Sequence, residues 1–293
     1  MKAFESYHPI ILFFYFFSMI FVTMFTTNPI LLVISFVGSI LFCWMLIGTN
    51  EMLKSLGYSL IMMLIMAITN PLFVHRGETI LFFMNGNPIT LEAILYGLNI
   101  SLMIIAVFYW FKCYNLVMTS DKVIYLFGRM IPKLSLLISM VINYVPKFKR
   151  RYHEIDDAQK ALGFYSQESY IDKIKSKFRI LSILVTWSLE NSVEMADSMR
   201  SRGYGLKGRS SYSIFKWTVR DTLMMCITLL LSIAVFTILG MGYGTFEFYP
   251  VVSQFDVSAA ALVLYIALFL FAFVAFISEI KENLLWRYLS LKI

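Results

Sequence analysis

Few residues of this chain are placed to perform catalysis. The three histidines, His8, His75 and His153, fall in three different regions, so we expect each to be a loop or interface residue rather than a metal ligand. Asp156 and Asp157 are adjacent on a helical stretch and face different directions, without a second acidic cluster to complete a Mg²⁺ site. No glycine-rich phosphate-binding motif of the Walker A type occurs, so the chain cannot be its own ATPase. An intramembrane enzyme, such as a prenyl transferase or a membrane protease, is therefore disfavoured, and we expect no metal and no cofactor.

Two helix ends with the same residue pattern indicate binding to a partner instead. Asp157-Ala-Gln-Lys-Ala-Leu-Gly-Phe164 and Asp197-Ser-Met-Arg-Ser-Arg-Gly-Tyr204 align without gaps, each with an Asp, a cation three residues later, and a Gly followed by an aromatic residue. Gly163 and Gly203 can take the left-handed conformation that closes a helix, and a cation in the last turn complements the helix dipole. The pattern predicts two equivalent helix ends presented to a dimeric partner. The alternative is that any two capped helices would share these residues.

Each of these ends closes a predicted amphipathic helix, one over residues 146–162 and one over residues 179–202. The apolar stripe of the first comprises Phe148, Tyr152, Ile155, Ala158 and Leu162; that of the second comprises Leu181, Leu184 or Val185, Leu189, Val193, Ala196 and Met199, with Glu190, Glu194, Asp197 and Arg200 outside it. The two helices can pack on each other. The apolar stretch 132–145 reaches only about 20 Å as a helix, so we expect a separate short helix that lies along the membrane face or packs under the bundle.

The remainder of the chain has the composition of a membrane protein. Apolar residues make up 59% of the 293 residues and charged residues only 15%, against roughly 45–50% and about 25% in soluble domains. Six segments approach the length of about 20 apolar residues that a spanning helix needs: 9–26, 29–48, 53–70, 91–116, 222–240 and 259–280. The first of them lacks a small-residue cleavage site, so we interpret it as a span rather than a signal peptide. The fold class expected is an all-α polytopic membrane protein with a long amphipathic module.

The distribution of cations predicts the topology. Of the 25 Lys and Arg residues, 18 lie between residues 121 and 220, and cations near spans are retained in the cytoplasm. We expect four spans in residues 1–117, cytoplasmic helices in residues 118–215, two spans in residues 216–293, and both termini in the cytoplasm. The net charge of +7 then reflects this bias and attraction to anionic lipid, or docking to an acidic protein, and needs no nucleic acid. On the opposite side, Asn85-Gly86 favours a tight turn, either of a short hairpin or of a re-entrant loop.

An autonomous secondary transporter is a further alternative. Such a carrier usually places ionisable groups near the bilayer midplane, and the six segments hold essentially none away from their ends. Lys112 lies within about two turns of the end of its segment and can extend to the interface. A scaffold that transmits motion explains this lack of charge better than a carrier does. The three cysteines, Cys43, Cys113 and Cys226, lie far apart in apolar segments and are expected to be core residues.

The chain resembles the transmembrane T components (EcfT and CbiQ-like proteins) of energy-coupling factor transporters, which are bacterial vitamin and metal importers related to ABC transporters. The resemblance extends over nearly the whole length. It is carried by Tyr7-His-Pro9, Asn85-Gly-Asn-Pro88, Met118-Thr-Ser-Asp-Lys122, Phe127-Gly-Arg-Met-Ile-Pro132 and above all by Ala196-Asp-Ser-Met-Arg-Ser-Arg-Gly-Tyr-Gly205.

The resemblance implies a non-enzymatic coupling subunit in the bacterial cell membrane. In that family, two short Ala-Arg-Gly-like motifs at the ends of the coupling helices dock into grooves on two cytoplasmic ATPase subunits, which bind the ATP. The residues implied here are Ala161, Leu162 and Gly163 at the first end, Ser201, Arg202, Gly203 and Tyr204 at the second, and Ala158, Ala196, Asp197, Met199 and Arg200 on the coupling helices. Leu162 replaces the arginine of the first motif, which predicts an apolar contact and a heterodimeric ATPase pair. A separate membrane S component would bind the vitamin or metal ion.

Overall fold

The computed structural model describes residues 4–84, 86–128, 131–163, 170–206 and 215–290, and these residues are predominantly helical. The chain divides into two compact units. The bundle unit comprises residues 1–123 and 215–293, and the inserted unit comprises residues 124–214. The expected all-α polytopic class is confirmed, and the only strands in the described residues form a small hairpin.

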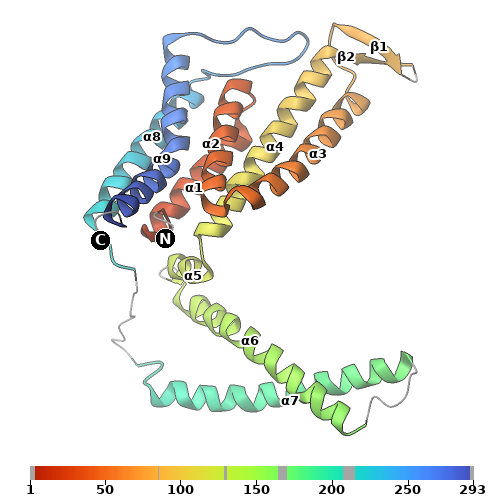
Figure 1. Ribbon diagram of the computed structural model, residues 1–293, viewed down its shortest axis with the longest axis vertical. Helices are drawn as coiled ribbons and strands as arrows, with labels where there is room; N and C mark the ends of the chain where they lie inside the picture. Colours follow the sequence, from red (N-terminus) through yellow and green to blue (C-terminus); the bar gives the residue numbers. More distant parts are fainter. Residues whose placement is uncertain (1–3, 85, 129–130, 164–169, 207–214, 291–293) are drawn as a thin grey trace. The chain divides into compact units, whose positions relative to one another are not determined.

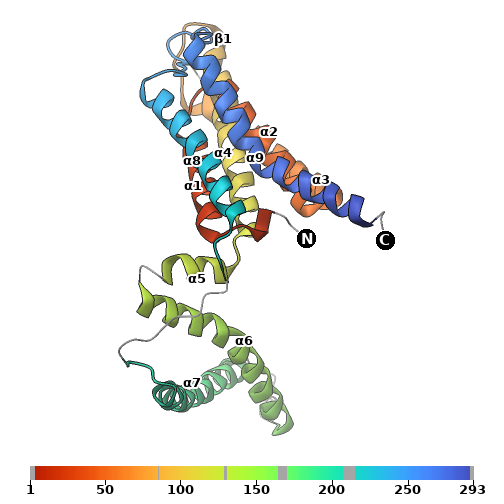
Figure 2. The ribbon, with the colours of Figure 1, turned by 90° about the vertical axis from the view of Figure 1, so that its left-hand side faces the viewer.

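The described part of the bundle unit contains six long helices, preceded by a short 3-10 helix, η1 (Phe4–Ser6). Figure 1 and Figure 2 show these helices side by side: α2 packs on α4 and α9, α3 packs on α4, and α8 packs on α9. The helices are α1 (Pro9–Phe25), α2 (Pro29–Ile47), α3 (Thr49–Phe73), α4 (Leu91–Val117), α8 (Val219–Gly240) and α9 (Ala259–Ser290).

Polar residues set where these helices begin. His8 and Asn28 are each followed by proline, and each side chain accepts a hydrogen bond from the backbone N–H two residues later, at 3.4 and 2.9 Å. Proline suits the first helical position because its missing N–H would be unpaired there. Thr90 caps α4 by accepting from the N–H of Ala93. Thr218 and Asp221 form a reciprocal capping box at the start of α8.

Five of these helices, α2, α3, α4, α8 and α9, are long and apolar enough to cross a membrane. The first expected span forms α1, which is apolar but has 17 residues, the lower limit of about 17–25 residues for a spanning helix. Two of the expected segments were too short. The segment expected at 53–70 extends as α3 from Thr49 to Phe73, and the segment expected at 259–280 extends as α9 to Ser290.

Aromatic side chains fill the core of the bundle unit. Tyr15 and Phe16 of α1 meet Phe4, Trp110 and Phe271 in edge-to-face contacts with ring centroids 5.3–6.3 Å apart, the geometry that aromatic quadrupoles favour. All five side chains are fully buried. This cluster joins the N-terminal segment to α1, α4 and α9.

The hairpin expected around Asn85-Gly86 is confirmed. β1 (Ile80–Met84) and β2 (Asn87–Thr90) pair antiparallel, with Met84 opposite Asn87, and Gly86 has φ +80°; Asn85 itself lies outside the described residues. The base of the hairpin is held to α4 because the carboxylate of Glu92 accepts hydrogen bonds from the backbone N–H and the hydroxyl of Thr79, at 3.2 and 2.6 Å.

The inserted unit is built from two long helices. α5 (Ser120–Gly128) leads into it, followed by α6 (Pro132–Ala161) and α7 (Tyr170–Ser201). The expected separate helix over 132–145 is wrong, because α6 continues through Pro146. Proline has a φ compatible with a helix and removes one backbone hydrogen bond; Pro146 is exposed, so water can pair with the carbonyl that loses its donor. The second helix also begins earlier than residue 179, the expected start.

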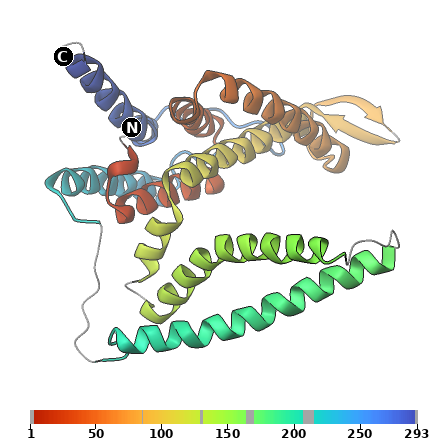
Figure 3. The same cartoon turned by 60° about the horizontal axis from the view of Figure 1, so that its bottom comes forward.

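α6 and α7 pack on each other (Figure 3). The contact involves only part of the apolar stripes that were expected to meet. Ile155 of α6 is buried against Ile180 and Leu184 of α7, and Phe148 packs at the edge of this cluster. The ring of Phe148 also meets Trp187 edge-on, with centroids 5.5 Å apart. Of the predicted stripe of α7, only Leu184 takes part in this buried cluster. Its other large aliphatic members are exposed in this chain: Leu181, Val185, Leu189 and Val193.

Candidate functional site

The end of α7 is closed by a complete glycine cap. The backbone N–H of Gly203 donates to the carbonyl of Arg200 at 2.9 Å, and the N–H of Tyr204 donates to the carbonyl of Met199 at 3.0 Å. These two bonds define the Schellman motif, which needs a left-handed residue after the last helical turn. Gly203 supplies that conformation with φ +80°. The cap predicted from the sequence is confirmed here.

The end of α6 closes in the same way as far as it is described. The N–H of Gly163 donates to the carbonyl of Lys160 at 3.0 Å, the counterpart of the bond between Gly203 and Arg200, and Gly163 has φ +76°. Phe164, the counterpart of Tyr204, lies outside the described residues. The two ends therefore share a backbone conformation, in addition to a residue pattern.

The side chains at the two ends differ in chemistry. Leu162 precedes the glycine of α6 and is 71% exposed, whereas the exposed residue at the same position of α7 is Arg202. Among the described residues, Arg202 and Arg200 have no carboxylate within ion-pairing distance. By contrast, Lys160 bonds to the carboxylates of Asp156 and Asp157 at 2.7 and 3.2 Å, and these hydrogen bonds raise the pKa of Lys160.

The other predicted site residues lie around these two tips. Ala158 and Ala161 are exposed on the last turns of α6, and Ala196, Asp197 and Ser201 are exposed on those of α7; Met199 is half-buried and Tyr204 is 43% exposed. The two tips belong to one unit but are carried by different helices, and each is formed by residues adjacent in sequence. The chemistry that they offer is surface contact: an aliphatic group on one tip, and a guanidinium with an aromatic ring on the other.

A buried lysine anchors the chain where it leaves the bundle unit, and sequence reasoning missed this role. Lys122, one of the residues behind the family resemblance, is only 5% exposed. Its ammonium group donates to the backbone carbonyls of Glu5 and Val117, at 2.6 and 2.9 Å. Burial lowers the pKa of Lys122, and the nearby Glu5 carboxylate raises it in part. The start of α5 is therefore tied to the N-terminal segment, residues 4–8.

The same N-terminal segment anchors the point where the chain returns to the bundle unit. The carboxylate of Asp221 accepts a hydrogen bond from the backbone N–H of His8 at 3.0 Å, while its second oxygen accepts from the N–H and the hydroxyl of Thr218, at 2.9 and 2.6 Å. The rings of His8 and Trp217 lie 4.8 Å apart. The residues that lead into and out of the inserted unit are thus both bonded to one short segment, residues 4–8.

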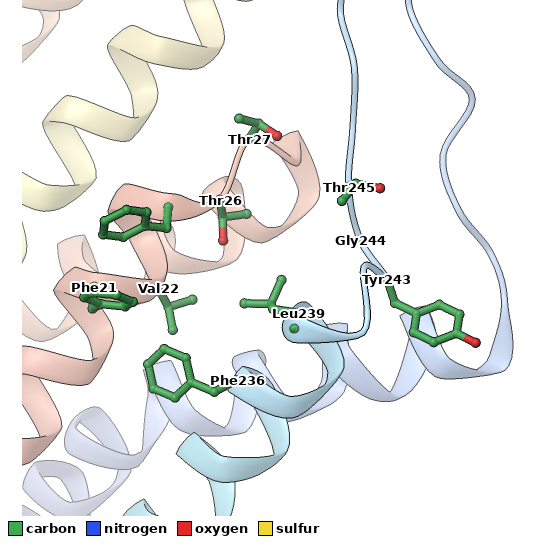
Figure 4. Close-up of a pocket in the computed structure, with 11 residues that line it drawn as sticks. Phe21, Val22, Thr26, Thr27, Phe236, Leu239, Tyr243, Gly244 and Thr245 are labelled. Carbon is green, nitrogen blue, oxygen red and sulfur yellow. The ribbon is translucent and has the colours of Figure 1, made fainter.

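A cavity of about 330 Å³ lies elsewhere in the bundle unit, between the ends of α1 and α8 (Figure 4). Phe21 and Phe236 lie in its wall and contact each other edge to face, with ring centroids 5.7 Å apart, and Thr26, Thr27 and Tyr243 also line it. Its described lining contains no carboxylate, imidazole or ammonium group. The cavity can hold an apolar group. No group of three potential metal ligands occurs among the described residues.

The fold and these tips define a class of protein: a polytopic helical membrane protein with a pair of long helices inserted between its spans. A family model described as CbiQ, cobalt transport protein, matches residues 8–214, and the chain belongs to this family. The match covers the residues of both helix tips, 158–163 and 196–204, and confirms the resemblance derived from the sequence.

Individual relatives agree with this assignment. The chain is 33% identical to the energy-coupling factor transporter transmembrane protein EcfT of Lactococcus lactis over 103 residues, 34% of this chain and 39% of the relative. It is 31% identical to the same-named protein of Streptococcus equi over 106 residues, 36% of this chain and 39% of the relative. A longer match, 26% identical over 187 residues, covers 60% of this chain and 70% of EcfT from Staphylococcus aureus. The chain therefore covers about two fifths of the length of the first two relatives.

Proposed function

We propose that this protein is the transmembrane coupling subunit of an energy-coupling factor importer in a bacterial cell membrane. The observation that carries the proposal is the pair of helix ends closed by the same glycine-centred hydrogen bond, each presenting an exposed side chain before its glycine. Leu162 and Arg202 each enter a groove on one of two cytoplasmic ATPase subunits. ATP is bound by those subunits, and a separate membrane subunit binds the vitamin or metal ion. The inserted unit and both termini then lie on the cytoplasmic side.

Exposed apolar faces on the inserted unit support the need for partners. Leu181, Val185, Leu189 and Val193 recur at four-residue intervals on α7 and are 52–64% exposed. Residues at this spacing form one continuous strip along a helix. A contiguous exposed apolar patch is typical of an interaction surface. In the proposed complex this strip of α7 contacts the substrate-binding membrane subunit.

The lengths and anchors of the helices suit the transmission of movement. α7 has 32 residues and is about 48 Å long at 1.5 Å per residue, so displacement of its tip moves the whole rod. Both chain junctions of the inserted unit are fixed to the N-terminal segment through Lys122 and Asp221. Closure of the two ATPases would displace the tips, and these fixed junctions would pass the displacement to the bundle unit.

Charge reversal at the tip of α7 tests the proposal. Arg202→Glu should weaken binding of the purified protein to the ATPase pair by about tenfold or more, because hydrogen bonds to charged groups contribute roughly 1.5–3 kcal/mol, and should abolish uptake. Lys177→Glu is the matched control, since Lys177 is an exposed cation on the same helix, far from the tip. Equal binding and uptake by both variants would contradict the docking role.

Substitutions of Leu162 test whether the two grooves differ. Leu162→Asp should weaken binding because it buries an unpaired carboxylate, at about 1–3 kcal/mol, whereas Leu162→Met should have little effect. Leu162→Arg should weaken binding to the one ATPase subunit that receives α6. Affinities measured for each ATPase subunit separately decide this point: unchanged or tighter binding of Leu162→Arg to both subunits would show two arginine-accepting grooves.

A further inference from the structure

A groove lies between α3 and α4 on the side of the bundle unit. It encloses about 520 Å³. One part is lined by Glu51, Lys54 and Ser55 of α3 and by Lys112 of α4. These residues lie near the N-terminal end of α3 and near the C-terminal end of α4, so the polar part of the groove lies near one end of both helices. In a membrane helix pair, that end lies near the headgroups rather than at the bilayer midplane.

The cations in this groove are not neutralised within the described chain. Lys112 is half-buried and its ammonium group donates to the hydroxyl of Ser55 at 2.7 Å. Neither Lys112 nor Lys54 has a carboxylate within 4 Å among the described residues, although Glu51 lines the same groove. Lys112 retains further N–H donors, because an ammonium group has three. Two ammonium groups and one carboxylate leave an excess positive charge for an anionic ligand.

The rest of the groove is apolar and faces outward. Met62 and Phe108 line it and are 49% and 52% exposed, and Ile104 lies in the same wall. From Lys54 to Met62 the groove follows eight residues of α3, or about 12 Å. A ligand that fits must therefore carry a negative charge at one end and a hydrocarbon chain at the other.

We propose that this groove binds one anionic phospholipid of the phosphatidylglycerol type. The phosphate lies between Lys54 and Lys112, and an acyl chain lies over Ile104, Met62 and Phe108. The glycerol hydroxyls of the headgroup can donate to Glu51, which accounts for the single carboxylate in a cationic site. Basic pockets between membrane helices are known to receive lipid headgroups. The proposal depends only on the membrane location of the bundle unit and is independent of ATPase coupling.

Lipid titration of the purified full-length protein in detergent, followed by native mass spectrometry, tests the site. The probes are dioleoylphosphatidylglycerol and, for comparison, dioleoylphosphatidylcholine and dioleoylphosphatidylethanolamine. The wild type should retain phosphatidylglycerol in preference to both zwitterionic lipids. Lys54→Gln and Lys112→Gln should each lower that affinity about fivefold, since a cation near the headgroups contributes roughly this factor. Lys281→Gln, at an exposed cation of α9, should leave it unchanged.

Three results would overturn the proposal. The first is equal retention of the three lipids, which would show no preference for an anionic lipid and would favour a protein partner for the groove. The second is competition by glycerol 1-phosphate, which would indicate a soluble phosphate ligand instead of a lipid. The third is unchanged phosphatidylglycerol affinity in Lys54→Gln. The variant Lys112→Gln loses the hydrogen bond to Ser55 and could be destabilised for that reason. Lys54 has no hydrogen-bond partner among the described residues, so Lys54→Gln remains informative in that case.

Discussion

Replacement of Asp221 by Asn should destabilise the junction where the inserted unit returns to the bundle. Asp221 is 4% exposed, and its carboxylate accepts three hydrogen bonds, one from His8 and two from Thr218. An amide has one acceptor oxygen and one NH₂ donor. In either orientation of the new side chain, the NH₂ group must therefore face at least one backbone N–H, either that of His8 or that of Thr218.

The size of the effect follows from the bond that must be lost. A hydrogen bond to a charged group contributes about 1.5–3 kcal/mol, and the bonds that remain lose their charged acceptor. In a protein of this size, such a loss corresponds to a decrease in Tm on the order of 5 °C. The affected contact joins residues 213 positions apart, so the N-terminal segment should become more accessible to hydrogen exchange.

Thermal unfolding in detergent and hydrogen exchange at residues 4–8 are the measurements for this prediction. Glu282→Gln is the control, because Glu282 forms a partly exposed ion pair with Arg220 at 3.4 Å, and such pairs contribute at most about 1 kcal/mol. A Tm of Asp221→Asn equal to that of Glu282→Gln, with unchanged exchange of the N-terminal segment, would refute the inference that this carboxylate anchors the junction.

Two further predictions concern the helix cap and the buried histidine. Gly203→Ala should cost roughly 1–2 kcal/mol in cap stability because Gly203 has φ +80°; faster hydrogen exchange of the Tyr204 amide should report it, and protection equal to wild type would contradict the cap. Burial lowers the pKa of His8 below its usual 6.5, with Asp221 raising it in part. The unfolded chain then binds the proton more strongly, so His8 should contribute stability above pH about 6.5 that is lost as the pH falls. The decrease in Tm between pH 7.5 and 5.5 should be smaller in His8→Gln; an identical decrease would exclude this contribution.

Local sequence patterns were sufficient to predict the helix caps and the hairpin. Gly163 and Gly203 follow cation-bearing helical turns, and both take the positive φ that the pattern predicts. The turn at Asn85-Gly86 was predictable for the same reason, because few residues other than glycine adopt such a backbone at low cost. In each case the determining interactions lie within about five residues of one another.

Predictions that depended on more distant contacts were less accurate. Pro146 suggested a break in the helix, but α6 continues past it on an exposed face. The expected stripe of α7 was chosen from apolar residues at helical spacing. It included Leu184 but not Ile180, and both are used in the buried contact, because the crossing with α6 selects which part of the apolar surface is covered. The roles of Lys122 and Asp221 were not predictable, since their partners lie 117 and 213 positions away.

The electrostatic difference between the two tips bears on the nature of the ATPase pair. The last turns of α6, residues 156–163, carry two carboxylates and one ammonium group, whereas those of α7, residues 196–203, carry one carboxylate and two guanidinium groups. The tips thus have the same backbone cap but opposite net charge. A symmetric dimer presents the same groove twice, and a groove with a potential complementary to one tip would repel the other. The proposed partner is therefore a pair of unlike ATPase subunits, one with an acidic groove for Arg202 and one with an apolar groove for Leu162.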